Sequence, residues 1–251
     1  MKTAASQAIG TLGVALGTIL VLLGAGVALF LNPFWVAFEQ GRANAAGWTG
    51  FSAVDLRSAT DAILRDLYLG GRFDVTVGGV PVLDVREQAH MHDVRAVFGW
   101  FAVAVIAGAA VLLMGRALSG GARWYWRAIQ SGATVLAVTV VALGITALFA
   151  FDAMFEAFHE VFFAGGSYTF DPRTERLVQL FPDQFWFETS TALAIVLVVM
   201  AVVVRFLAAR KADRAGRVVA AAPVATPSPP DGPIEASAEA LVEPSAGASR
   251  S

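Results

Sequence analysis

The chain has 251 residues, of which 57% are hydrophobic and 15% are charged. Soluble domains carry about 25% charged residues, so this composition predicts a protein with several membrane-spanning helices. The formal net charge of −2 gives no support for nucleic-acid binding, and the absence of cysteine excludes disulfides, thiolate nucleophiles and cysteine metal sites.

Four long apolar runs predict four transmembrane helices, because a span needs about 17–25 apolar residues. The first run exceeds the apolar region of a signal peptide, about 7–15 residues, so we expect an uncleaved anchor. The four helices are expected at residues 1–32, 96–116, 128–151 and 189–209.

Lysine and arginine mark the sides of the membrane. The loop at residues 117–127 contains arginines and no acidic residue, and basic residues follow the fourth run. Short basic loops face the cytoplasm, so we place this loop, both termini and a disordered tail at residues 210–251 there. The segments 33–95 and 152–188 are then external.

The first external segment predicts a small cap. Apolar residues recur at helical spacing over residues 51–69, and alternation around Gly78-Gly79 predicts a β-hairpin over residues 73–85. The expected fold class is therefore an all-α polytopic membrane bundle of four transmembrane helices with a small external α+β cap.

The second external segment, residues 152–188, is rich in aromatic residues. Aromatic rings favour the boundary between headgroups and acyl chains, so this segment is expected to contact lipid glycerol and acyl chains. The substrate-binding candidates within it are Phe162, Phe163, Tyr168, Phe185 and Trp186.

Two of the three histidines flank the second and third apolar runs. His90 precedes the second run, and His159 follows the third. Because a short loop makes these spans antiparallel neighbours, we expect both histidines on the external side in one cleft. An imidazole can act there as base, acid or nucleophile.

Three carboxylates, those of Glu87, Asp93 and Glu160, are candidates to orient an imidazole, although each could also be a solvated charge at a helix end. His92 would point about 200° away from His90 on a helix. In a strand the two would share a face, and with His159 and Glu160 they could bind a metal ion. The sequence contains no HExxH pattern that would support this metal site. It also lacks the GxSxG pattern of a serine nucleophile, so Ser167 is assigned to a loop.

The arrangement of these motifs over about residues 8–206 resembles the lipoprotein intramolecular transacylase (Lit) family. The specific part of the likeness lies in four short segments. They are His90-Met91-x-Asp93-Val94, His159-Glu160-x-Phe162-Phe163, Asp171-Pro172 and Leu180-Phe181-Pro182-x-x-Phe185-Trp186.

The resemblance implies a bacterial membrane enzyme that needs no cofactor or metal. Proteins of that family move the sn-2 acyl chain of a diacylglyceryl lipoprotein to the α-amine of its N-terminal cysteine, which gives the lyso form. Carried over by motif, His90 and His159 would be the catalytic pair on the external face of the cytoplasmic membrane. Diacylglyceryl lipoproteins and membrane lipid would be the partners. One departure is Tyr168, since the family commonly has tryptophan soon after the second histidine motif.

Two alternatives remain open from the residues. The external aromatic cleft could hold a lipid or lipoprotein without reaction, and His90, His92 and His159 could handle a metal ion. The sequence does not say which histidine is base or nucleophile.

Overall fold

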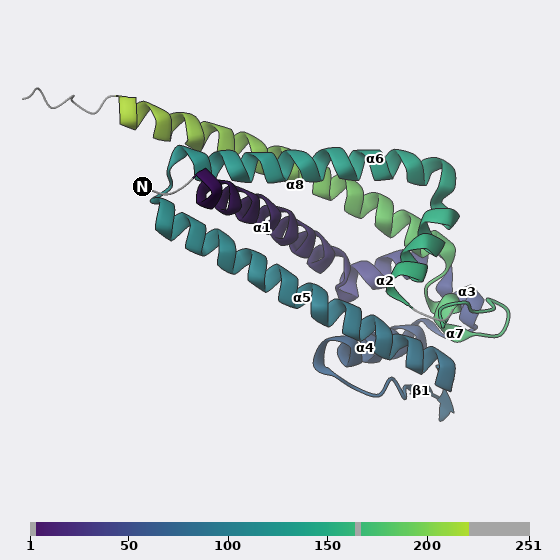
Figure 1. Cartoon of the computed structure of the whole chain (residues 1–251). Coiled ribbons are helices and arrows are strands. Elements are labelled where there is room, and N and C mark those ends of the chain that lie inside the picture. The colour runs from purple at the N-terminus through teal and green to yellow at the C-terminus, as the bar shows by residue number, and fades with distance from the viewer. Residues whose placement is uncertain (1–3, 164–166, 221–251) are drawn as a thin grey trace, which may run out of the picture.

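Four long helices form most of the computed structural model, which describes residues 4–163 and 167–220 (Figure 1). Each contains a stretch long and apolar enough to cross a membrane. The predicted fold class, a four-helix membrane bundle with a small α+β cap, is confirmed. The long helices are α1 (Ala4–Phe30), α5 (Val85–Ser119), α6 (Arg123–Phe162) and α8 (Asp183–Ala220). The shorter elements are α2 (Pro33–Arg42), α3 (Ala45–Thr49), α4 (Ala53–Leu69), β1 (Thr76–Val77), β2 (Val80–Pro81) and α7 (Arg176–Leu180).

Helix α1 packs against α5, α6 and α8, and α6 packs along α8. Glycines let these helices approach closely, as small residues do in membrane bundles. A Cβ atom on Gly17 of α1 would lie 2.8 Å from the carbonyl oxygen of Gly108 on α5, and one on Gly132 of α6 would lie 2.4 Å from that of Ala15. The bundle is therefore held by backbone-to-backbone contacts that larger side chains would disrupt.

Large apolar side chains cover the outside of the bundle. Trp100 and Ile106 of α5 are 76% and 69% exposed, and Phe149 of α6 is 86% exposed. Such a surface is unfavourable in water and favourable in hydrocarbon. This distribution fits helices whose outer faces contact lipid.

The cap is built from both external segments. Ser52 caps α4 by accepting the backbone N–H of Asp55, and Gly78 and Gly79 turn the hairpin with φ values of 58° and 78°. The cap core includes the fully buried Phe73. Residues of the second external segment complete this core, among them Leu177, Leu180 and Phe185.

The helices extend beyond the apolar runs. Helix α5 begins at Val85, so the segment containing His90 is helical, and α6 continues to Phe162 through non-helical torsion angles at Ala150 (φ −147°, ψ 42°). Helix α8 continues to Ala220, which corrects the expectation of a disordered tail from residue 210. Alanine, lysine and arginine, which dominate residues 210–217, are strong helix formers, and Ala212 is fully buried. The rest of the expected tail, residues 221–251, lies outside the described residues.

Candidate active site

A capping box places His90 one turn inside α5. The side chain of Asp84 accepts the backbone N–H of Glu87 at 2.8 Å, and the Glu87 carboxylate accepts that of Asp84 at 2.7 Å. These bonds satisfy the first free N–H groups of the helix and fix where it begins. The His90 side chain is buried, with the residue only 6% exposed.

The end of α6 brings His159 to His90. Beyond Ala150, α6 turns sharply toward the start of α5 (Figure 1). The centroids of the two imidazoles lie 6.3 Å apart, with 26° between the ring planes. Residues 69 positions apart in the sequence thus place two proton-transferring groups side by side.

The two imidazoles differ in how their Nδ1 atoms are bonded. Nδ1 of His159 donates a hydrogen bond to the carbonyl oxygen of Phe155 at 2.7 Å, which leaves Nε2 as the basic nitrogen of the neutral ring. Nδ1 of His90 is buried and has no hydrogen-bond partner among residues 4–163 and 167–220. The pair can therefore accept and return protons.

Aromatic rings enclose the pair. Phe163 lies 4.8 Å from the ring of His90 and 5.4 Å from that of His159, measured between centroids. Phe170 meets His90 edge-on at 5.4 Å. Phe155 and Tyr168 lie 4.1 and 5.0 Å from His159. The immediate surroundings of both imidazoles are therefore largely aromatic and apolar.

The predicted substrate-binding residues lie at different distances from the pair. Phe163 and Tyr168 pack directly on the imidazoles, whereas Trp186 reaches His159 only through Phe155, at 6.1 Å. Phe162 packs on Phe158 and is 49% exposed. Phe185 is buried in the cap core.

Phe155 and Phe170, which the sequence analysis did not select, contact the imidazoles directly. Phe155 lies four residues before His159, so helical spacing would have pointed to it once the end of α6 was known. No periodic signal in the sequence marks Phe170.

The three predicted orienting carboxylates lie in different surroundings. Glu87 is 1% exposed and accepts the backbone N–H of Leu177 at 2.6 Å, so it joins α5 to α7. Asp93 and Glu160 are exposed, and their side chains form no hydrogen bond or ion pair with the rest of the described chain. None of the three forms a hydrogen bond with an imidazole of the pair.

His92 faces away from the pair, as its helical spacing from His90 requires. Its Nδ1 accepts a hydrogen bond from Nη2 of Arg95 at 2.7 Å, and its ring packs edge-on against Phe73. Within the described ranges, no group of three or more histidine, aspartate or glutamate side chains could hold a metal ion. The metal alternative required the side chains of His90 and His92 on one face, but on helix α5 they point to different faces.

Tyr168 contributes its ring rather than a base. Its hydroxyl donates to the carboxylate of Glu156 at 2.8 Å, and this hydrogen bond is the main reason why the pKa of Tyr168 rises to about 12. The phenol therefore keeps its proton at neutral pH. Ser167 lies beside it, in the segment between α6 and α7, as expected of a loop residue.

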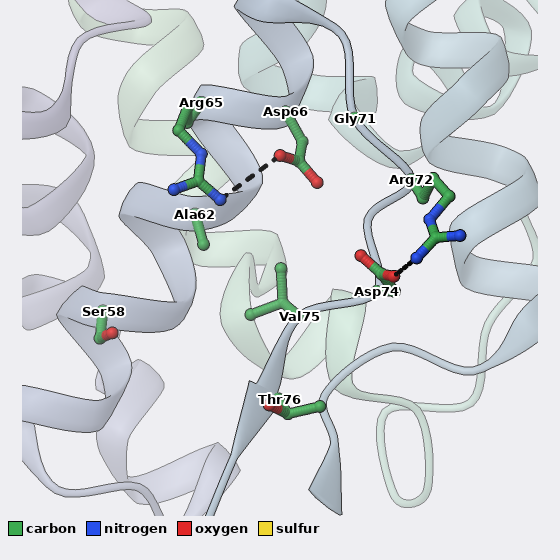
Figure 2. A pocket seen from close by; sticks show the side chains of 9 residues that line it. All are labelled: Ser58, Ala62, Arg65, Asp66, Gly71, Arg72, Asp74, Val75 and Thr76. Atoms are coloured by element: carbon green, nitrogen blue, oxygen red, sulfur yellow. Dashed lines mark hydrogen bonds and ion pairs between the residues drawn. The ribbon is translucent and has the colours of Figure 1, made fainter. Parts of the chain in front are cut away.

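A pocket of about 420 Å³ lies elsewhere on the cap, between α4 and the segment leading into β1 (Figure 2). Its charges are paired within it, Arg65 with Asp66 and Arg72 with Asp74. None of the predicted site residues lines this pocket. We therefore assign the candidate site to the histidine pair.

The fold and the site define an integral membrane protein with two histidines enclosed by aromatic rings beneath a small cap. Residues 12–186 match the lipoprotein intramolecular transacylase Lit family, and the chain belongs to this family. It is accordingly a lipoprotein intramolecular transacylase, an enzyme that acts on lipoproteins.

Solved structures share the fold. The structure of the membrane-integral lipoprotein intramolecular transacylase Lit from Bacillus cereus has 16% sequence identity and a TM-score of 0.71, covering 86% of this chain and 100% of that one. A variant of the same protein with a histidine replaced by arginine gives 14% identity and a TM-score of 0.69, covering 86% of this chain and 95% of that one. No curated protein matches the chain.

Proposed function

We propose that the enzyme moves the sn-2 acyl chain of a diacylglyceryl lipoprotein to the α-amine of its N-terminal cysteine, with His90 and His159 as catalytic residues. The observation that carries this proposal is the 6.3 Å separation of the two imidazoles inside an aromatic enclosure. The product is a lyso-form lipoprotein with an amide-linked acyl chain.

The two imidazoles can supply the proton transfers that this reaction needs. The amine nitrogen attacks the carbonyl carbon of the sn-2 ester, a C–N bond forms, and the amine loses a proton. When the tetrahedral intermediate collapses, the bond from the carbonyl carbon to the sn-2 oxygen breaks and that oxygen takes up a proton. One imidazole accepts the amine proton and becomes an imidazolium, and this same proton then passes from the histidine pair to the glycerol oxygen, so both imidazoles end neutral as they began. No water, cofactor or external acyl donor enters the balance.

A second route through the same atoms uses Nε2 of His159 as a nucleophile. It would form an acyl-imidazole as the bond to the sn-2 oxygen breaks and that oxygen takes up a proton, and the amine would then take the acyl chain, lose one proton and free Nε2 again. The hydrogen bond from Nδ1 to Phe155 supports this route as well, because it leaves Nε2 free.

The aromatic rings can hold the substrate in a reactive pose. Amine and ester belong to one substrate molecule, so holding them in contact replaces a bimolecular encounter with an intramolecular step. Flat apolar walls such as Phe163 and Phe170 suit a folded glyceryl-cysteine headgroup and the start of its acyl chains. The substrate would then enter this site from the surrounding membrane lipid.

We also infer that the histidine pair faces the external side of the membrane and that both termini are cytoplasmic. Support comes from the basic residues at the opposite end of the bundle, such as Arg116 in the last turn of α5 and Arg123 and Arg127 at the start of α6. Because the chain lacks cysteine, single substitutions report the topology directly. A membrane-impermeant maleimide should label Thr76→Cys in intact cells and Ser119→Cys only after lysis. Labelling in the reverse order would overturn the orientation.

Mass spectrometry of a lipoprotein's N-terminal lipopeptide tests the reaction. Membranes with the wild-type chain should convert the diacylglyceryl form to the N-acyl, monoacylglyceryl form, and His90→Ala or His159→Ala should leave it unconverted. His92→Ala is the matched control, since this histidine faces Arg95 and Phe73, and it should convert normally. Full conversion by the double variant His90→Ala/His159→Ala would refute the proposed catalytic pair.

A further inference from the structure

One arginine on α5 holds the segment that covers His90. The guanidinium of Arg86 lies 5.0 Å from the centroid of the Phe170 ring and forms an ion pair with Glu175. Another oxygen of the Glu175 carboxylate accepts the backbone N–H of Asp171. Arg86 thus contacts both ends of the segment 170–175.

Arg86 and His90 lie on the same face of α5, because residues four apart on a helix are neighbours. Phe170 contacts both of them. Its ring lies under the guanidinium of Arg86, at 5.0 Å, and meets the imidazole of His90 at 5.4 Å with 67° between the planes. A displacement of Arg86 would therefore reach His90 through this ring.

The orientation of His90 depends on such packing. A catalytic imidazole is usually fixed by a hydrogen bond on its second nitrogen, but Nδ1 of His90 has no such partner in the described part of the chain. Phe163 and Phe170 pack against its ring instead. Phe163 directly follows α6, whereas Phe170 is held in place by Arg86 and Glu175.

Arg86 and Glu87 are adjacent on α5, but their side chains make different contacts. Glu87 is 1% exposed and bonds to the backbone of α7, so its loss would disturb the cap. The side chain of Arg86 is 53% exposed and that of Glu175 is 12% exposed, so the pair lies at the edge of the cap, where an ion pair adds less to global stability than a fully buried one. Removal of Arg86 is therefore expected to leave the fold intact and to loosen segment 170–175.

We propose that Arg86 is a positioning residue for the transfer reaction: it holds Phe170 edge-on against His90 and thereby sets how this imidazole faces His159. The inference rests on the catalytic role of His90 in the proposed function. Arg86 itself contacts neither imidazole and takes no part in the proton transfers.

A double-mutant cycle on the full chain in lipid nanodiscs tests this, with a synthetic diacylglyceryl lipopeptide that has a free cysteine amine. Arg86→Gln and Phe170→Leu should each lower kcat about tenfold with KM changed less than about twofold, as for a small misplacement of a catalytic group. The double variant should be no slower than Phe170→Leu alone. Arg86→Lys, which keeps the ion pair, should recover kcat to within about threefold of wild type.

Arg72→Gln is the matched control, since Arg72 forms an exposed ion pair with Asp74 beside the α4 pocket (Figure 2) and should change kcat by less than about twofold. The positioning role would be overturned if the losses of kcat in Arg86→Gln and Phe170→Leu multiply in the double variant. An unchanged kcat in Arg86→Gln would overturn it as well. If Arg86→Gln does not fold, the cycle of Glu175→Gln with Phe170→Leu decides by the same criterion. Full activity of His90→Ala would instead remove the proposed catalytic pair, so the two failures are distinguishable.

Discussion

His159 donates a hydrogen bond from Nδ1 to the backbone oxygen of Phe155, one turn earlier on α6, at 2.7 Å. The same residue contributes a ring that packs on the imidazole at 4.1 Å. One helical turn therefore fixes both the proton position and the orientation of this histidine. In the neutral ring Nε2 is then the nitrogen available for reaction.

Two amide substitutions separate these roles of His159. In His159→Asn the amide nitrogen can still donate to the oxygen of Phe155, so the unfolding temperature should stay close to that of wild type. The transfer rate should fall about 10²–10⁴-fold in His159→Asn and in His159→Gln, because neither amide can take up a proton. Initial rates with the lipopeptide and thermal unfolding in detergent measure both effects. An asparagine variant with more than a tenth of wild-type activity would contradict the role of Nε2.

Tyr168 should be replaceable by another aromatic residue. Tyr168→Phe removes the hydrogen bond to Glu156 and keeps the ring on His159, so we expect a rate within about threefold of wild type. Tyr168→Trp should also remain active, whereas Tyr168→Ala should lose at least about tenfold because one wall of the enclosure is gone. Lipopeptide conversion rates check the series. A Phe variant as slow as the Ala variant would mean that the hydroxyl takes part.

The sequence predicted that His90 and His159 lie on the same side of the membrane because that depends only on topology, whereas their close approach also needs the bend of α6 at Ala150. Two antiparallel spans joined by a short loop must return to the same side of the membrane. The helical nature of the His90 segment was not predictable from apolar runs, since the capping box of Asp84 and Glu87 sets the start of α5 beyond the apolar part.

Long-range contacts explain what the sequence did not predict. Glu87 bonds to the backbone of Leu177, which is 90 positions away, so its place in the cap could not be read from neighbours in the chain. Phe170 lies in a segment without periodicity, and its position depends on the pairing of Arg86 with Glu175. Such pairings become visible only when both external segments have folded into one cap.

Helix α6 approaches the backbone of α1 closely at Gly132, so adding a single methyl group there should destabilise the bundle. Gly132→Ala would place a Cβ atom 2.4 Å from the backbone oxygen of Ala15, so the helices must move apart, at about 1–3 kcal/mol. Gly144→Ala, on the same helix with no atom within 4 Å of the new Cβ, should instead stabilise by about 0.5–1 kcal/mol. Thermal unfolding in one detergent compares them. Equal unfolding temperatures would show that the contact at Gly132 is not tight.

Glu39 of α2 predicts a pH dependence of stability. It is 1% exposed, beside Arg42 and Glu188. Burial first, and then the neighbouring carboxylate of Glu188, raise the pKa of Glu39 from 4.5 to about 7. A carboxyl whose pKa is higher in the folded state stabilises the fold fully below its unfolded pKa, and this contribution is lost as the pH rises through the folded pKa.

Between pH 5 and pH 8 the wild-type chain should therefore lose about 2 kcal/mol of stability that Glu39→Gln does not lose, since glutamine mimics the protonated acid. At pH 5 the two unfolding temperatures should nearly coincide, and at pH 8 the variant should unfold at the higher temperature. Asp74→Asn, which neutralises an exposed carboxylate on the cap, serves as the control and should track the wild type across the range. Parallel curves for wild type and Glu39→Gln would mean that Glu39 is ionised throughout, because only a carboxyl that binds its proton more tightly in the folded state makes the two curves diverge.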